Sequence, residues 1–173
     1  LSLVGSEMCI RDSSWMTAAG FSTALAAFTG QNYGAGNYER IRKGYRLTLG
    51  IAGSIGLGAG ILFFVLNHEI FGLFVNEPEA IEAGGNYLKI LALSQLFMVT
   101  ESVTAGAFNG TGHTTPPALT GIIFTGARIP MAYFLTSFPQ LGLTGIWWSI
   151  TISSILKGSV LPLWFLHFQR KLK

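Results

Sequence analysis

Long apolar stretches separated by short polar connections run through most of this 173-residue chain. A helix needs roughly 20 mostly apolar residues to cross a hydrocarbon core of about 30 Å. Five stretches reach that length, so the pattern predicts an all-α integral membrane protein built as a five-helix transmembrane bundle. The predicted spans are residues 15–33, 45–66, 86–108, 116–136 and 143–167.

Turn and cap residues mark the ends of several predicted spans. Gly34-Ala35-Gly36 allows the positive φ of a tight turn, and Asn37 is expected to cap the helix that follows. Asn76 and Thr115 stand shortly before prolines and are expected to start the third and fourth helical segments. Gly84-Gly85 is expected to interrupt the lead-in to the third span.

Glycine and proline residues inside the spans predict how these helices pack and bend. Gly56 and Gly60 are four residues apart, which predicts close packing against a neighbouring helix, with a helix that bends during transport as the alternative. Pro130 removes one helical hydrogen bond and clashes with the carbonyl of Gly126. The fourth span is therefore expected to kink beside Arg128.

Composition agrees with a membrane protein. Half of the residues are hydrophobic and 11% are charged, whereas soluble domains carry roughly a quarter charged residues. A lipid bilayer is the expected surrounding, and the net charge of +3 then bears on membrane orientation, with no nucleic-acid partner expected. No phosphate loop, nucleophile elbow or metal-ligand spacing is present, so neither an enzyme nor a metal centre is predicted.

Positive charge is unevenly distributed between the two predicted sides of the membrane. One connection and the C-terminal tail are basic, whereas the connections on the other side lack Lys and Arg, and residues 67–85 are acidic instead. Because cytoplasmic loops carry an excess of Lys and Arg, we expect a multi-pass protein whose C-terminus lies in the cytoplasm. Its expected location is the cytoplasmic membrane of a bacterium. The basic residues are Arg40, Arg42, Lys43, Arg46, Arg170, Lys171 and Lys173.

The first thirteen residues, LSLVGSEMCIRDS, differ in character from the rest of the chain. They resemble translated sequencing-adapter read-through and lack the basic start and long apolar stretch of a signal peptide. We therefore expect residues 1–13 to be a disordered artefact and residues 14–173 to carry the fold of the chain. This interpretation implies that the natural protein continues upstream.

Three ionisable residues lie well inside the predicted spans: Glu101, Arg128 and Lys157. Each charge costs roughly 2.5 to 3.5 kcal/mol near a helix centre. A rise of about 1.5 Å per residue places them about 10 to 18 Å from the cytoplasmic helix ends, so the carboxylate can face both cations. They form either a structural ion pair or a protonatable or cation-binding site in a transport path. Nearby oxygens that could share a cation belong to Ser94, Gln95 and Thr100.

The stretch TALAAFTGQNYGAGNYERIRKGYRL closely resembles the signature at the end of the eighth helix in the multidrug and toxic compound extrusion (MATE) family. In that family a helix ends in Gly-Gln-Asn, turns on Gly-Ala-Gly and is followed by basic residues. Downstream, GAFNGTGHTTPP, RIPMAYFL and GLTGIWWSITISSILKG are similar to the family's later turn and last two helices, in the same order. The resemblance covers about residues 14–170.

The resemblance implies a twelve-helix transporter of two lobes that exchanges Na⁺ or H⁺ for organic, often cationic, compounds. This chain would be helices eight to twelve, a partial C-terminal lobe whose partner is the missing N-terminal lobe. Glu101 is similar to a carboxylate that some members carry on helix ten, and it is the residue expected to couple the cation or proton. Gln31, Asn32, Arg128 and Lys157 are expected in the substrate path or coupling network. The coupling ion replaces any cofactor.

Two other functions remain open from the sequence. A lipid-linked oligosaccharide flippase of the same superfamily is expected to carry more basic residues along its cavity and to lack the Gly-Gln-Asn turn. A structural membrane protein without transport is the other alternative, in which the three charges only hold helices together.

Overall fold

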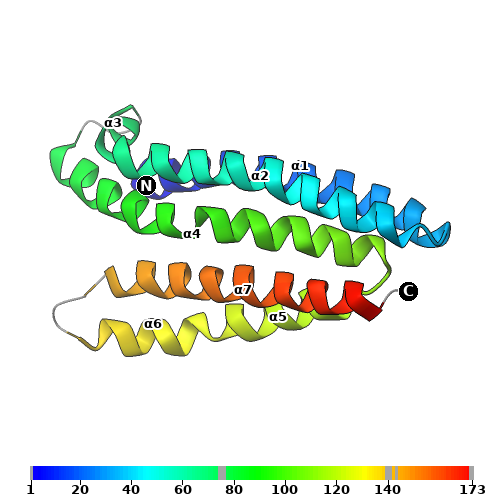
Figure 1. The fold of residues 1–173 in the computed structure, drawn as a ribbon. Coiled ribbons are helices and arrows are strands. Elements are labelled where there is room, and N and C mark those ends of the chain that lie inside the picture. The colour runs from blue at the N-terminus through cyan, green and yellow to red at the C-terminus, as the bar shows by residue number, and fades with distance from the viewer. Residues whose placement is uncertain (1, 74–76, 139–141, 143, 172–173) are drawn as a thin grey trace.

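A computed structural model describes residues 2–73, 77–138, 142 and 144–171, with side chains from Trp15 onward except those of residues 79 and 80 (Figure 1). This part of the chain is helical and contains no strand. The helices are α1 (Ser2–Gly34), α2 (Tyr38–Val65), α3 (Asn67–Gly72), α4 (Pro78–Gly110), α5 (Thr115–Gly126), α6 (Arg128–Thr136) and α7 (Thr144–Lys171).

Four helical segments are long and apolar enough to cross a membrane: Tyr38–Val65, Ile81–Gly110, Thr115–Thr136 and Thr144–Lys171. They correspond to four of the five predicted spans. The remaining predicted span, residues 15–33, lies in α1. This helix packs in the same bundle but is less apolar than the four helical segments that could cross a membrane. Its small residues and its polar end make it less hydrophobic than the other four.

The N-terminal segment differs from the sequence-based expectation. The sequence predicts disorder for residues 1–13, whereas α1 is helical from Ser2 onward. Side chains before Trp15 lie outside the described part of the chain. The adapter origin of this segment and its lack of packing partners therefore stay predictions.

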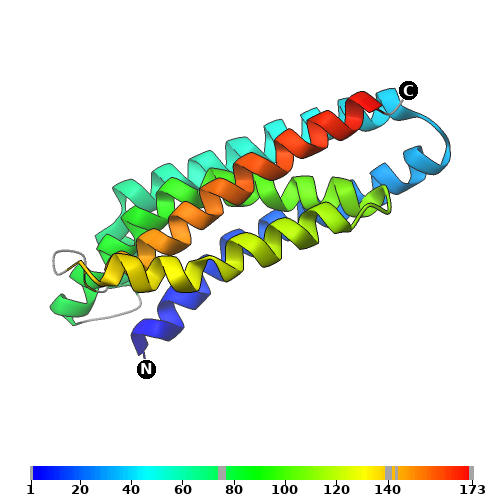
Figure 2. The same ribbon diagram turned by 90° about the horizontal axis from the view of Figure 1, so that it is seen from below.

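The helices lie side by side, and α4 is at the centre of the bundle (Figure 1). It packs against α1, α2 and α7, and the α5–α6 segment packs on α7. A view from below shows α1 and α5–α6 along one edge, α2 and α7 along the other, and α4 between them (Figure 2). Helices α1 and α6 therefore share this edge of the bundle, although Figure 1 shows α1 above α4 and α6 below it.

A buried cluster joins α4 to the helices on either side of it. Tyr45 of α2 is 1% exposed, and its hydroxyl shares a hydrogen bond of 2.9 Å with Thr104 Oγ1. Its ring packs on Phe165 of α7, with centroids 4.6 Å apart, and Phe165 in turn packs on Phe108. Many large apolar side chains remain exposed, including Leu57, Ile122, Ile129 and Leu163, as expected for surfaces that face lipid.

Helices α1 and α4 end in the same C-terminal capping motif. At the end of α1, Gly36 has φ of 70°, Asn37 N–H donates to the Asn32 carbonyl at 2.8 Å, and Gly36 N–H donates to the Tyr33 carbonyl at 3.1 Å. This is a Schellman motif, and it confirms the predicted turn. Asn37 takes the N-cap position of α2 but makes no side-chain capping bond. Gly112, with φ of 77°, closes α4 with the same pattern of hydrogen bonds.

The expected interruption at Gly84-Gly85 is wrong, because α4 runs through both glycines. A Cβ on Gly84 would collide with the ring of Phe71, and one on Gly85 would lie 2.9 Å from the His68 ring. Both rings belong to α3, a short helix that the apolar pattern did not predict. The glycines therefore allow α3 to pack closely on α4. Asn76, the expected cap, lies outside the described residues, and α4 begins at Pro78.

The predicted close packing of α2 is confirmed. A Cβ on Gly56 would lie 2.9 Å from Val99, and one on Gly60 would lie 3.0 Å from the Ala92 carbonyl oxygen of α4. The fourth span is interrupted where the kink was predicted, since α5 ends at Gly126 and α6 begins at Arg128, two residues before Pro130. Hydrogen bonds from Ala127 and Met131 continue across this junction.

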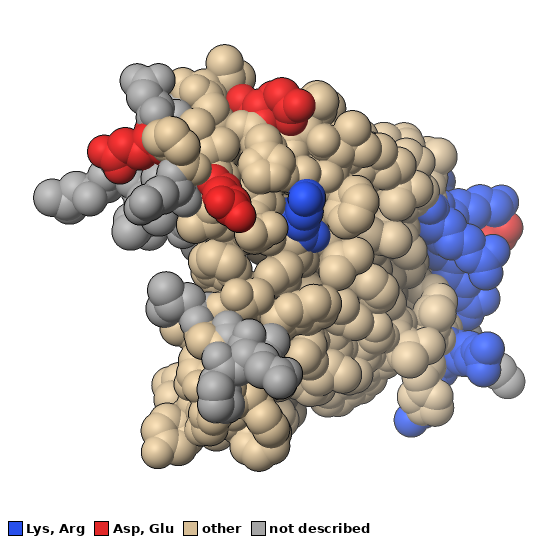
Figure 3. Space-filling model, turned by 90° about the vertical axis from the view of Figure 1, so that its left-hand side faces the viewer, with Lys and Arg blue, Asp and Glu red and all other residues tan. Residues whose placement is uncertain are grey.

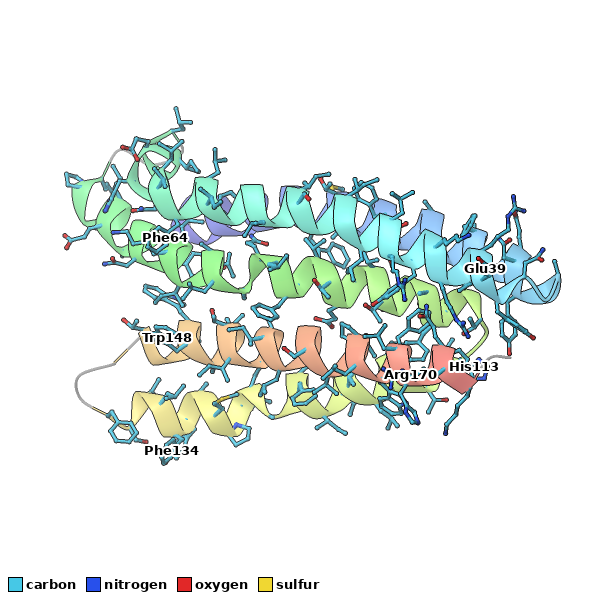
Figure 4. The ribbon with its side chains drawn as sticks, viewed as in Figure 1. Glu39, Phe64, His113, Phe134, Trp148 and Arg170 are labelled. Atoms are coloured by element: carbon cyan, nitrogen blue, oxygen red, sulfur yellow. The ribbon has the colours of Figure 1, made fainter. Side chains whose placement is uncertain are left out.

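The charges of the described residues separate along the bundle. The turn after α1 and the C-terminus lie at the same end (Figure 1). Acidic side chains gather on the end of the bundle that faces the viewer in Figure 3. Most of the basic side chains visible there lie along the right-hand edge of the picture. Figure 4 shows Glu39, His113 and Arg170 at one end and Phe64, Phe134 and Trp148 at the other. The predicted charge asymmetry is therefore present, and which end faces the cytoplasm stays a prediction.

Candidate functional site

The three charged residues predicted inside the spans line one cavity of about 470 Å³. It lies between α1, α4, α6 and α7. On α4 the lining residues recur every three or four positions and so share one helix face. The cavity is lined by Trp15, Leu91, Ser94, Met98, Glu101, Ser102, Ala105, Arg128, Ile150, Ser154 and Lys157.

Glu101 and Lys157 form an ion pair across the α4–α7 contact. Lys157 Nζ lies 2.9 Å from Glu101 Oε1, and the Lys157 and Glu101 side chains are 12% and 21% exposed respectively. Gly158 makes this approach possible, since a Cβ there would lie 2.6 Å from Phe97 Cβ and still closer to the Phe97 carbonyl oxygen. Gly158 follows Lys157 directly, so it lets the α7 backbone pack against α4 beside the ion pair.

Arg128, the first residue of α6, reaches the same cavity from the interruption between α5 and α6. Its Nε donates to Ser153 Oγ at 2.5 Å and its Nη2 donates to Ser154 Oγ at 3.2 Å. Ser153 is fully buried, and its own hydroxyl donates to the Ile150 carbonyl at 2.9 Å. Two adjacent hydroxyls of α7 therefore orient the guanidinium.

This arrangement combines one carboxylate, two cationic side chains and several hydroxyls in a partly closed space. A carboxylate held by an ammonium group can exchange that partner for a proton or a metal cation, because all three neutralise its charge. The serine hydroxyls can supply neutral oxygen ligands or accept hydrogen bonds. Of the oxygens expected from sequence, that of Ser94 lines the cavity, whereas Gln95 and Thr100 line other hollows of the bundle.

Gln31 and Asn32 lie at the end of α1 and do not line this cavity. Gln31 is exposed, whereas Asn32 is 8% exposed and its Nδ2 donates to the Phe28 carbonyl at 2.8 Å. The backbone carbonyl of Asn32 accepts the hydrogen bond that closes the Schellman motif. In this chain the two amides therefore belong to the turn between α1 and α2.

Sequence reasoning missed four polar or aromatic members of the site. Trp15 lines the cavity from α1, and Ser102 follows Glu101 on α4. Ser153 and Ser154 on α7 were missed although they precede Lys157 by four and three residues, the spacing of one helix face. That spacing was a usable signal for the two serines, whereas nothing in the sequence indicated the position of Trp15.

The MatE family model matches residues 1–134 of this chain, which is most of its length. The chain belongs to the MatE family. The matched range includes the thirteen residues whose origin stays a prediction. The ordered sequence motifs and the bundle of long helices agree with this assignment.

Curated relatives carry names of multidrug transporters. The chain is 34% identical over 158 residues to the "Probable multidrug resistance protein NorM" of Thermotoga maritima, covering 88% of this chain and 33% of that protein. It is 25% identical over 145 residues to the human "Multidrug and toxin extrusion protein 1", covering 83% of this chain and 25% of that protein. The chain thus spans about a third or less of these two relatives.

Solved MatE-type structures share the fold. An outward-facing MATE family transporter of the MOP superfamily superimposes with a TM-score of 0.90 at 23% identity, covering 99% of this chain and 39% of that one. An inward-facing conformation gives a TM-score of 0.88 at 22% identity, covering 98% and 40%. The likeness to both structures shows that this chain shares the fold of that part of these transporters.

Proposed function

We propose that this chain is part of a secondary active multidrug efflux transporter that exchanges Na⁺ or H⁺ for organic, often cationic, compounds. In this proposal the protein crosses the cytoplasmic membrane of a bacterium, its C-terminus lies in the cytoplasm, and the missing N-terminal lobe completes the pathway. The names of the relatives support efflux. The single observation that carries the assignment of this segment is the Glu101–Lys157 pair inside a cavity of a membrane bundle.

Glu101 is the proposed coupling residue. A proton or Na⁺ that binds its carboxylate competes with Lys157 Nζ, which lies 2.9 Å away. Binding therefore loosens the bridge between α4 and α7 and frees a cation inside the cavity. If the bridge has different strength in the inward-open and outward-open states, ion binding shifts the balance between them, which is the requirement for exchange.

The cavity supplies groups for either ion. Ser94, Ser102 and Ser154 line it and offer oxygens to a sodium ion beside Glu101. One structural neighbour of this chain, with a TM-score of 0.81 at 17% identity, is described as a MATE transporter in complex with Rb⁺. That description supports an alkali-cation site within this fold, while proton coupling needs only the carboxylate.

Two observations favour the efflux proposal over the flippase alternative. The chain has the Gly-Gln-Asn turn that the flippase is expected to lack, and its cavity pairs one of its two basic residues with Glu101. A purely structural role remains the competing account of the ion pair, because Lys157 joins two helices that pack closely. The experiment must therefore separate coupling from folding.

The test is Glu101→Gln in the full-length transporter, assayed by ion-driven efflux of a cationic dye from reconstituted vesicles. The amide keeps the side-chain shape and removes the charge, so efflux should be lost while protein yield stays near normal. Glu39→Gln is the matched control, because Glu39 also pairs with a lysine, Lys43 at 2.8 Å, but is exposed at the end of the bundle. It should transport normally.

Two outcomes would contradict the proposal. Normal efflux by Glu101→Gln would remove Glu101 from coupling. Loss of folded protein in Glu101→Gln that is rescued by adding Lys157→Met would identify the pair as structural, since the double variant removes both charges of the pair. Rescue of efflux together with folding would make that conclusion firm.

A further inference from the structure

A second cavity, of about 420 Å³, lies at the end of the bundle where α1 turns into α2 and α7 ends. Arg42 and Arg46 line it from α2, and Leu166, Gln169 and Arg170 line it from α7. It shares no lining residue with the Glu101 cavity. The coupling proposal uses none of its residues.

One residue of the cavity lining has a buried side-chain amide with an unmet hydrogen bond. Gln169 is 5% exposed, and its Nε2 is buried with no hydrogen-bond partner. Its backbone carbonyl is already used, because it accepts a hydrogen bond of 2.8 Å from Arg42 Nη2. A buried amide donor without an acceptor is unfavourable, so a ligand oxygen beside Gln169 would be stabilising.

The positive charge of the cavity lining favours an anionic ligand. Three guanidinium groups line the cavity, and none of the described residues around it is acidic. The nearby carboxylate of Glu39 does not line the cavity. It pairs with Lys43 at 2.8 Å and also interacts electrostatically with Arg42. Guanidinium groups present planar forks of donors that match phosphate oxygens, and the Gln169 amide adds one neutral donor.

The apolar surroundings favour a phosphate that belongs to a lipid. Leu166 forms one wall of the cavity and is 41% exposed, and Leu163, one turn earlier on α7, is 66% exposed. Both lie in a membrane-spanning helix on the bilayer side of the arginines. A basic cavity at the end of such helices, next to exposed leucines, fits a headgroup with its acyl chains directed along the helices.

We propose that this cavity binds the phosphate of an anionic phospholipid, such as phosphatidylglycerol, in the leaflet at the α1–α2 turn. The phosphate bridges α2 and α7, compensates the charges of Arg46 and Arg170, and accepts the Gln169 Nε2–H bond once that side chain turns toward it. The lipid thereby holds the ends of two helices together on the side where the positive charges gather. This binding is independent of the ion coupled at Glu101.

The experiment is native mass spectrometry of the full-length transporter titrated with phosphatidylglycerol, and with phosphatidylcholine of the same acyl chains. The variants are Arg46→Gln, Arg170→Gln and Gln169→Leu. The matched control is Arg40→Gln, which removes one exposed arginine from the same end but not from the cavity. The first two variants alter exposed side chains and are expected to fold.

Phosphatidylglycerol should bind more tightly than phosphatidylcholine. Each replacement of a cavity arginine should weaken the affinity for phosphatidylglycerol about fivefold. Gln169→Leu should also weaken it, whereas Arg40→Gln should not. Equal weakening by Arg40→Gln would reveal diffuse surface attraction and overturn the proposal. Unchanged binding in Arg46→Gln and Arg170→Gln would do the same. Displacement of the lipid by millimolar inorganic phosphate would show a site for the free anion instead.

Discussion

Replacing Gly158 by alanine tests whether the α4–α7 contact sets the geometry of the ion pair. The added Cβ would lie 2.6 Å from Phe97 Cβ and closer still to the Phe97 carbonyl oxygen. Carbon atoms in contact prefer about 3.5 to 4.0 Å, so the α7 backbone must move away from α4 by about 1 Å. The obstacle includes backbone atoms, which cannot rotate out of the way as a flexible side chain can.

Overpacking of this kind costs about 1 to 3 kcal/mol. Alanine recovers up to about 1 kcal/mol because it favours helix more than glycine does. Gly50→Ala separates the two effects, since Gly50 lies inside α2 and a Cβ added there would meet no atom within 4 Å. Both variants gain the same helix propensity, so the difference between their stabilities measures the overpacking alone.

The assay is thermal unfolding of the full-length transporter in detergent, combined with dye efflux. Gly158→Ala should be less stable than Gly50→Ala by about 1 to 3 kcal/mol. It should also transport more slowly, because displacement of α7 carries Lys157 away from Glu101. Equal stability of the two variants would refute the reasoning that this glycine is required for close approach. Full efflux in a destabilised Gly158→Ala would show that the pair tolerates a longer separation.

Three further outcomes are expected in the full-length transporter. Gly36→Ala should cost about 1 kcal/mol in thermal melts, because a side chain is strained at a φ of 70°, whereas Gly34→Ala should not destabilise. Cysteines at positions 35 and 77 should react with an impermeant maleimide from opposite sides of the membrane, and same-side labelling would contradict the bundle topology. The predicted kink implies that Pro130→Ala should restore a helical hydrogen bond and lengthen the distance between spin labels at the two ends of α5–α6, and an unchanged distance would contradict it.

The sequence alone determined the class of the protein and most of its helices. Apolar stretches of membrane length predicted four helices that the structure confirms as long and apolar enough to span. The Gly34–Gly36 turn could be predicted because only backbone freedom and local hydrogen bonds decide it. The depth of Glu101, Arg128 and Lys157 followed from the constant helical rise, which made their meeting geometrically reasonable.

Only the tertiary structure decided which partners these residues take. Both the lipid-facing and the core-facing sides of a membrane helix are apolar, so the sequence pattern does not reveal how each helix is rotated. The orientation of each helix about its own axis pairs Glu101 with Lys157. It also brings Arg128 to the hydroxyls of Ser153 and Ser154. The same limit concealed α3, which is too short for a periodic signal, and the role of Gly84 in receiving its Phe71 ring. These contacts depend on side chains far apart in sequence, and they exist only after the helices have packed.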